Sequence, residues 1–431
     1  MATELRILVL VPGAPEGRVA GPEIRAWELA RALAAHHPVT AVVRRGAAGG
    51  RDGVRIVPWT RRAILREALR HDVVVSACLP PFLLAAKALH GLIAVSDQYD
   101  PLENELVHLD DGRYRSRELR TAAAARELQL RHADLVLCAG ERQRDALLRV
   151  WPDASVAPPP LVVPFGLPPA PPAPRRRPLR ERFPQISGDD TVVLWWGSIW
   201  RWLDAATAIR AVAGLSERRP DIKLVITAGR PPARDAERFA AVEQARALAH
   251  ALGVLDRTVL FVDEWIAYDE RHEVLADADI AITLPRDADE AELAARARYM
   301  DYLWAGLPCV LGRGDEMAEE LASAGFATLV EPGDPAATAA AVLALADDAD
   351  ALAAARTAGA RLADERRWPA VATTLSAALE GLAPPQRPVP SRGLVDLLRR
   401  SAAYYGGELA IRLRDTVAGW KDPRPAGVDS A

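Results

Sequence analysis

The 431-residue chain has little cysteine, no strong excess of charge of either sign and no long apolar run. Its three cysteines, Cys78, Cys138 and Cys309, lie in apolar runs, which favours buried free thiols in a reducing compartment over a disulfide framework. The net charge of −4 gives no support for bulk nucleic-acid binding. No apolar run reaches the ~20 residues of a membrane-spanning helix. We therefore expect a cytoplasmic globular protein, with the short apolar run near the N-terminus forming a first strand rather than a signal peptide.

Two patterns typical of common ligand sites are also missing. The eight histidines show no metal-ligand spacing, so we expect no metal site. The loop GAPEGRVAG is a poor match to the G-x-G-x-x-G pattern of dinucleotide-binding proteins, and no suitable acidic residue ends the second predicted strand. A dinucleotide oxidoreductase is therefore only a distant alternative.

Apolar strands alternate with helical segments along most of the chain, which predicts βαβ units and parallel sheets. The first series of strands is LRILVLVPG, TAVVRRG, VRIVPW, DVVVSACL, GLIAVSD, ADLVLCAG and LVVPFG. From Gly166 to Pro184 the chain is rich in proline, and we expect a linker without regular structure. The pattern then resumes with TVVLWWGS, IKLVITAG, RTVLFVDEW, ADIAITLP, LPCVLG and ATLVEPGD.

The predicted fold is therefore α/β, with two doubly wound Rossmann-like domains facing across a cleft. We assign residues 1–168 to the first domain, 169–190 to the linker, 191–385 to the second domain and 386–431 to a C-terminal tail. The tail is amphipathic, and we expect a helical extension that packs on the body, with contact to a membrane surface as the alternative. Ligands in such folds bind at the carboxyl ends of the strands.

The stretch ARARYMDYLWAGLPCVLGRGD, residues 295–315, predicts a helix that ends abruptly before a strand. Gly306 suits the position after the last helical residue, and Pro308 prevents continuation. Two arginines, Arg296 and Arg298, lie at the start of this helix. A helix N-terminus with basic side chains suits an anion such as a diphosphate.

Four motifs in order resemble the glycosyltransferases of family 4. They are GPEIRAWELARALA, VVPFGLP, LWWGSIWRWLDAATAIRAV and YMDYLWAGLPCVLGRGDEMAEELASAGFATLVEPGDPAATAAAV, and together they span most of residues 5–345. The tryptophan-rich third motif is similar to a bacterial subgroup. The resemblance implies a GT-B fold. It also implies a retaining, metal-independent transfer of a sugar from a nucleotide-diphosphate donor, of UDP or GDP type, to an acceptor hydroxyl, without a cofactor.

The resemblance places the donor on the second domain and the acceptor on the first. Arg296 and Arg298 are expected to hold the diphosphate, and Asp301 stands where relatives have a glutamate that binds ribose. The other expected donor contacts are Gly197, Ser198, Trp200, Arg201 and Trp265. Each has a structural alternative, which is core packing for the tryptophans and a solvated pair for the arginines.

One departure from the family bears directly on activity. Leu293 occupies the position of a glutamate that in relatives touches the donor sugar, and Glu290 or Glu292 is the nearest carboxylate that could replace it. We predict Glu290 as a catalytic residue, with a charged surface loop as the alternative. The alternatives that stay open are a catalytically impaired GT-B protein acting as a binding partner, and a nucleotide-sugar epimerase.

On the acceptor side, IAVSDQYDPLENE resembles the loop that faces the cleft in this family. Many relatives have a histidine there, whereas this chain has Asp97 and Asp100. We predict both as catalytic residues that position the acceptor or orient the hydroxyls of the sugar, with capping of the following helix as the alternative. Tyr99, Gly21 and Pro22 complete the predicted cleft loop. The acceptor is expected to be a carbohydrate, a lipid-linked precursor of a cell-surface polysaccharide or a natural-product aglycone.

Overall fold

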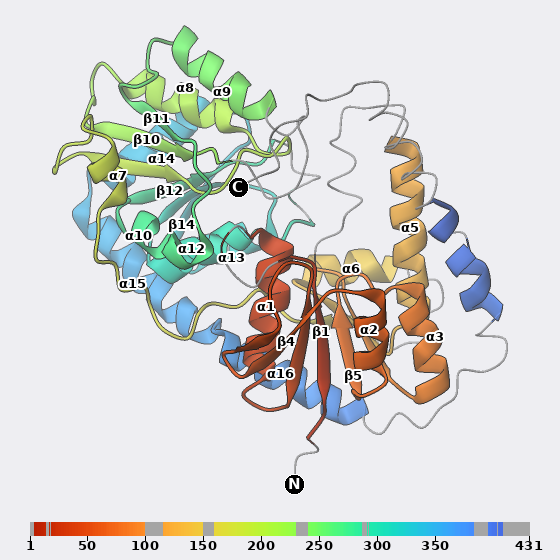
Figure 1. The fold of residues 1–431 in the computed structure, drawn as a ribbon. Helices are drawn as coiled ribbons and strands as arrows, with labels where there is room; N and C mark the ends of the chain where they lie inside the picture. The colour runs from red at the N-terminus through yellow and green to blue at the C-terminus, as the bar shows by residue number, and fades with distance from the viewer. Residues whose placement is uncertain are drawn as a thin grey trace.

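A computed structural model of the chain shows two α/β domains, coloured red to yellow and green to blue in Figure 1. The structure describes residues 4–13, 17, 19–99, 115–149, 159–229, 240–286, 291, 293–382, 395–402 and 404–407.

The first domain is built on an eight-stranded sheet with the order β3-β4-β2-β1-β5-β6-β7-β8. Every neighbouring pair is parallel except β3 and β4. Its central strands are buried on both faces, which explains their continuous apolar sequences. The bounds are β1 Ile7–Val11, β2 Val39–Val43, β3 Gly49–Arg51, β4 Val54–Pro58, β5 Val73–Ser76, β6 Ile93–Asp97, β7 Leu135–Cys138 and β8 Leu161–Val162.

Helices cover the faces of this sheet. Proline in the first turn begins α1 and α3, where the missing N–H costs nothing, and Thr60 caps α2 through its hydroxyl. The helices are α1 Gly21–Leu33, α2 Arg61–Ala68, α3 Pro81–His90, α5 Arg115–His132 and α6 Glu141–Arg149.

The second domain has a six-stranded, fully parallel sheet with the order β11-β10-β9-β12-β13-β14. The strands are β9 Thr191–Trp195, β10 Ile222–Thr227, β11 Val259–Val262, β12 Ile280–Thr283, β13 Cys309–Gly312 and β14 Ala327–Val330. The helices are α7 Pro178–Arg182, α8 Ala205–Leu215, α9 Ala240–Ala251, α10 Arg271–Ala276, α12 Ala297–Ala305, α13 Glu316–Ser323, α14 Pro335–Ala346, α15 Ala349–Glu365 and α16 Trp368–Leu382.

The strand orders fix where each domain can bind a ligand. In each sheet the order reverses beside the first strand of that domain, at β1 and β5 and again at β9 and β12. A crevice forms at the carboxyl end of the strands at such a switch point. The loops that follow β1 and β9 lead into these crevices.

The last long helix returns to the first domain. Although the sequence assigns residues 191–385 to the second domain, α16 packs against α1. The ring of Trp368 lies 5.5 Å from that of Phe165, and its backbone N–H donates to Leu167 O at 2.8 Å. Trp368 also covers Gly166, where an added Cβ would lie 2.5 Å from the indole. Trp368 of α16 thereby holds the start of the chain segment between the domains in place.

The α/β fold with two parallel-sheet domains is confirmed, and every strand listed above from the sequence is present. Three details differ. The antiparallel β3 was not predicted, and the linker is not free of regular structure, because Pro178 begins the short helix α7. Cys78 is exposed, since it lies beyond the end of β5, whereas Cys138 and Cys309 are buried free thiols as predicted.

The described part of the tail is helical over residues 395–402 and 404–407 and packs on the first domain. Asp396 lies 3.4 Å from His132, and Leu397 is buried. None of the described helices combines the length and apolar character that a membrane span requires.

Candidate functional site

The loop after β9 forms the centre of the candidate site. Gly197 follows the strand with a φ of +79°, a left-handed conformation that favours glycine. Its N–H donates to the hydroxyl of Thr227 at 2.7 Å, which fixes the turn. The buried Ser198 comes next. The loop therefore presents its backbone at the switch point of the second sheet.

Arg298, in the first turn of α12, reaches this loop. Its Nη2 donates to Ser198 O at 3.1 Å, and a Cβ added to Gly197 would lie 3.3 Å from the same nitrogen. Its Nη1 is buried and has no hydrogen-bond partner in the part of the chain that the structure describes. Burial lowers the pKa of this guanidinium. A buried donor without an acceptor costs folding free energy, and an acceptor on a bound ligand would remove that cost.

Arg296 has a different environment, although it stands only two residues away. It is the N-cap residue of α12, and its Nε donates to the buried carboxylate of Asp315 at 3.1 Å. Asp315 in turn caps α13 by accepting from Met317 N at 2.9 Å and Ala318 N at 3.2 Å. Arg296 therefore connects two helices of the second domain. The two arginines therefore have different partners, Asp315 for Arg296 and Ser198 O for Arg298.

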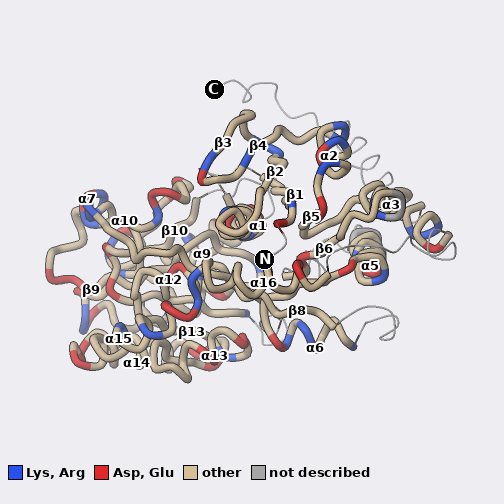
Figure 2. The backbone as a smooth tube through the Cα atoms, turned by 90° about the horizontal axis from the view of Figure 1, so that it is seen from below, with Lys and Arg blue, Asp and Glu red and all other residues tan. Residues whose placement is uncertain are grey.

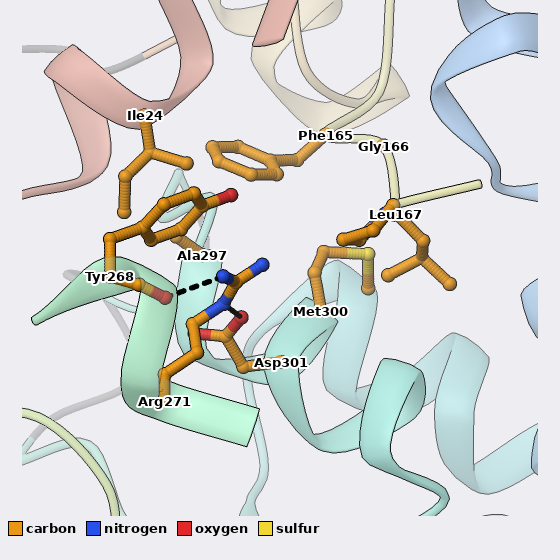
Figure 3. A pocket seen from close by; sticks show the side chains of 10 residues that line it. Ile24, Phe165, Gly166, Leu167, Tyr268, Arg271, Ala297, Met300 and Asp301 are labelled. Carbon is orange, nitrogen blue, oxygen red and sulfur yellow. Dashed lines mark hydrogen bonds and ion pairs between the residues drawn. The ribbon is translucent and has the colours of Figure 1, made fainter. Parts of the chain in front are cut away.

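Asp301 lines a small cavity between the domains (Figure 3). Both of its carboxylate oxygens accept hydrogen bonds. Trp196 Nε1 donates to Oδ2 at 2.9 Å, and Arg271 Nε donates to Oδ1 at 3.0 Å. The guanidinium of Arg271 also lies over the rings of Tyr268, at 3.6 Å, and Trp304, at 4.3 Å. The carboxylate predicted to bind ribose is thus held in a defined orientation by two donors.

This cluster continues into the first domain. The hydroxyl of Tyr268 donates to Glu28 of α1 at 3.2 Å, and its backbone N–H donates to Gly17 O at 3.0 Å. Burial raises the pKa of Glu28, although Arg31 beside it acts in the opposite direction. Burial likewise raises the pKa of Tyr268 well above its ordinary value. The turn before α10 is therefore in direct contact with α1.

The predicted cleft loop of the first domain lies at the start of α1, which begins with Gly21 and Pro22. A Cβ on Gly21 would lie 3.1 Å from the hydroxyl of Tyr99 and 3.9 Å from Cβ of Ala297, the first residue of α12. The N-termini of α1 and α12 therefore meet across the cleft. Both helix dipoles make this region favourable for an anion.

Asp97, at the end of β6, forms a buried ion pair that was not predicted. Arg25 of α1 donates to it through Nε at 2.7 Å and through Nη2 at 2.9 Å. Arg25 also donates to Val163 O at 2.9 Å and lies 4.8 Å from the ring centre of Tyr99. Its Nη1 has no partner among the described residues, but the carboxylate neutralises its charge. Asp97 therefore fixes α1 to the sheet beside the cleft.

The aromatic donor-site candidates occupy mixed positions. Trp200 stacks on Trp202 with ring centres 5.2 Å apart. Arg201, the residue between them in the sequence, is half-buried. Trp265 is half-buried, and its backbone lies so close to Gly229 that an added Cβ would be 2.5 Å from Trp265 N. Two further predicted residues, Glu290 and Asp100, lie outside the described residues.

Two other residues missed by the sequence analysis connect the domains. Gln143 of α6 donates through Nε2 to Tyr99 O at 2.8 Å and to Leu293 O at 2.7 Å. Glu316 accepts from the first backbone N–H groups of α6, Glu141 N and Arg142 N, at 3.0 Å each. A cavity of about 140 Å³ lies between these contacts. No sequence motif marks either residue, because each partner is more than 40 positions away.

The described residues contain no cluster of three or more histidine, cysteine, aspartate or glutamate side chains that could hold a metal ion. The arrangement that they do form is a polar cleft at two helix N-termini, in which Arg298, unlike Arg25, Arg271 and Arg296, has no carboxylate among them within ion-pair distance. Such a site can bind a phosphorylated ligand through backbone N–H groups and a guanidinium.

Comparisons with known proteins bear on the second domain and on the fold. Residues 190–348 match the family described as Glycosyl transferases group 1. A search of curated proteins finds no match for the chain.

The chain is also similar in fold to solved structures of other proteins. Alr3699/HepE of Anabaena, in complex with UDP-glucose, has a TM-score of 0.67 at 16% identity, covering 88% of this chain and 100% of that one. WaaG, a glycosyltransferase involved in lipopolysaccharide biosynthesis, has a TM-score of 0.63 at 17% identity, and the match covers 88% of this chain and 100% of that one. Sucrose-phosphate synthase of Thermosynechococcus elongatus has a TM-score of 0.62 at 18% identity, and the match covers 88% of this chain and 99% of that one. The chain thus has the GT-B fold, and its residues 190–348 match the glycosyl transferases group 1 family.

Proposed function

We propose that the protein is a retaining glycosyltransferase that moves a sugar from a nucleotide-diphosphate donor, of UDP or GDP type, to an acceptor hydroxyl without a metal ion. The observation that carries this proposal is Arg298, whose guanidinium lies at the Gly197–Ser198 turn with a buried Nη1 that has no partner among the described residues. A diphosphate at the start of α12 would accept that hydrogen bond. The similar Anabaena protein was solved with UDP-glucose, which supports the choice of donor class.

The reaction that we propose breaks the bond between the anomeric carbon and the β-phosphate oxygen and forms a bond to the acceptor oxygen on the same face of the sugar. The departing phosphate oxygen gains negative charge as its bond breaks, and it accepts the proton that the acceptor hydroxyl loses. The guanidinium of Arg298 and the N-terminus of α12 would stabilise that charge as it develops. The N-terminus of α1 would add to this field, because Gly21 lies against Ala297.

Two predicted acidic residues take more limited roles in this proposal. A carboxylate has about four lone-pair sites, so Asp301 could still accept from ribose while Trp196 and Arg271 orient it. Asp97 is held by Arg25, and we assign it a positioning role for α1 and Tyr99 rather than direct contact with the acceptor. Glu290 stays our candidate for the acid beside the donor sugar.

One observation favours a second candidate function. Leu293, in the position of the usual sugar-binding glutamate, contributes only its backbone oxygen, to Gln143. This supports a protein that kept the fold and the nucleotide site but lost transfer, acting as a binding partner. A nucleotide-sugar epimerase is a third candidate that shares the fold.

Thermal stability with UDP, GDP, ADP, dTDP and NAD distinguishes the binding classes. A ligand at about a hundred times its dissociation constant adds roughly 2.7 kcal/mol to the free energy of unfolding. We expect a rise in Tm with UDP or GDP, and a rise with NAD alone would overturn the proposal. Release of UDP or GDP from the matching nucleotide sugar then separates an active transferase from a binding protein.

For the acceptor we propose a carbohydrate, a lipid-linked precursor of a cell-surface polysaccharide or a natural-product aglycone, and for the location we propose the cytoplasm. An acceptor screen with radiolabelled nucleotide sugar tests the first. Product that partitions into organic solvent would identify a lipid-linked acceptor.

A further inference from the structure

The outer side of α2 carries cations and leucines together. The helix buries Ala63, Ile64, Glu67 and Ala68 against the first domain. Its other positions and the two residues that follow it are all exposed to solvent. This surface, called the α2 face below, consists of Arg61, Arg62, Leu65, Arg66, Leu69 and Arg70.

No exposed carboxylate balances these arginines within residues 61–70. The acid in this segment, Glu67, is buried and accepts from Arg55 and, at 3.2 Å, from Arg66. The α2 face is therefore strongly positive, although the whole chain has a net charge of −4. It also exposes 42% of Leu65 and 48% of Leu69.

The C-terminal helical segment adds a second apolar surface on the same layer of helices. Its Leu397 is buried in the same hydrophobic cluster as Ile64 of α2, and Arg400 pairs with Glu127 of α5 at 2.6 Å. Its outer side exposes Val395, Leu398 and Tyr405. Figure 2 shows α2, α3 and α5 together on one side of the first domain, with basic positions along α2.

The distribution of exposed apolar side chains singles out this layer. Among the described residues, seven large hydrophobic side chains are exposed, and five of them belong to the α2 face or to the C-terminal segment. The other two are far apart in sequence, since Leu148 lies on α6 and Leu252 in the turn that follows α9. Scattered apolar residues are normal on protein surfaces, whereas a concentration beside arginines indicates an interaction site.

We propose that the α2 face and the exposed side of the C-terminal segment bind the surface of a membrane that contains anionic phospholipids. Arginines would contact the phosphates, and the leucines, valine and tyrosine would enter the region between headgroups and acyl chains. Nucleic acid is the other polyanion that arginines attract, but it offers no apolar region for these side chains. Stable attachment generally needs both an apolar and a basic contribution, and this layer supplies both. The inference does not depend on the proposed transferase activity.

Sedimentation of the full-length protein with lipid vesicles, without any nucleotide, tests this inference. We expect binding to phosphatidylcholine vesicles that contain about one third phosphatidylglycerol and little binding to phosphatidylcholine alone. Leu65→Gln with Leu69→Gln should lower the partition coefficient by about tenfold or more. The matched control is Leu148→Gln with Leu252→Gln, which changes the same residue type on other exposed surfaces and should leave binding unchanged.

The arginines are tested in the same way. Arg61→Gln with Arg62→Gln should lower binding about tenfold at low salt, whereas Arg210→Gln with Arg218→Gln, at exposed positions of the second domain, should not. Equal losses in test and control variants would overturn the proposal, as would absence of binding to the anionic vesicles. Binding of an RNA oligonucleotide that survives the leucine changes and displaces vesicles would assign the surface to nucleic acid instead.

Discussion

Replacing Arg298 by alanine is the sharpest test of the candidate site. The side chain contributes a guanidinium whose Nη2 donates to Ser198 O at 3.1 Å and whose Nη1 is buried without a partner among the described residues. A hydrogen bond to a charged group contributes about 1.5–3 kcal/mol, so the loss of a contact to a diphosphate should weaken nucleotide binding roughly 10- to 150-fold. Isothermal titration calorimetry with UDP or GDP measures this directly.

Arg296→Ala is the matched control, since it removes the same side chain two residues earlier. Arg296 donates to Asp315, which is fully buried and caps α13. Breaking a buried ion pair costs up to about 3–5 kcal/mol of folding stability, so this variant should melt earlier. Its remaining folded fraction should bind the nucleotide with nearly normal affinity.

The two variants therefore separate stability from binding. Arg298→Lys adds a third comparison, because it keeps the charge but loses the planar arrangement of donors and should recover only part of the affinity. The assignment is refuted if Arg298→Ala is folded and binds UDP and GDP as tightly as the wild type. A loss of affinity that Arg296→Ala shares in full would also contradict it.

Three further predictions follow from single contacts. Gly197→Ala forces a side chain into a left-handed conformation at about 1–2 kcal/mol and against Arg298, so both Tm and nucleotide affinity should fall. Glu316→Ala removes the acceptor of two N–H groups at the start of α6 and should lower unfolding free energy by about 0.5–2 kcal/mol in urea titrations. Burial lowers the pKa of His37 in the folded protein below its ordinary value of ~6.5. The unfolded chain therefore binds a proton at this histidine more readily than the folded protein does. The contribution of the neutral imidazole to the free energy of unfolding is complete above pH ~6.5 and is lost as the pH falls below that value. Urea titrations between about pH 7 and 5 measure how steeply the free energy of unfolding changes with pH. His37→Gln should make this dependence less steep, and an unchanged dependence would contradict the role given to His37.

Local patterns in the sequence predicted the elements of the fold. Apolar runs such as Ile7–Val11 and Thr191–Trp195 are strands because parallel strands covered on both faces bury every side chain. The end of α12 at Gly306, with a φ of +60°, follows from the chemistry of one residue and its neighbour Pro308. Such features depend on a few consecutive residues.

Side-chain partners across the fold could not be predicted in this way. Arg25 and Asp97 are 72 positions apart, and Arg271 and Asp301 are 30 apart. Each pair forms because the folded chain brings a helix against a strand end or another helix. One signal was present, since Arg25 lies on the buried side of an otherwise amphipathic helix and a buried cation requires a carboxylate. A sequence motif can identify an arginine that is able to bind a phosphate, but it does not show whether a carboxylate elsewhere in the fold already forms an ion pair with that arginine.

Charge pairing then explains why Arg298 differs from the other arginines of the cleft. Asp97, Asp301 and Asp315 neutralise Arg25, Arg271 and Arg296, respectively, whereas Arg298 has no carboxylate within ion-pair distance among the described residues.

Burial of this unneutralised charge disfavours the folded state, and an anion that reaches it removes part of the cost. Inorganic pyrophosphate alone should therefore raise the Tm of the wild type more than that of Arg298→Ala. Equal shifts in the two proteins would mean that the anion binds elsewhere. Because pyrophosphate lacks both base and sugar, a selective shift would locate the diphosphate site whether or not the protein transfers a sugar.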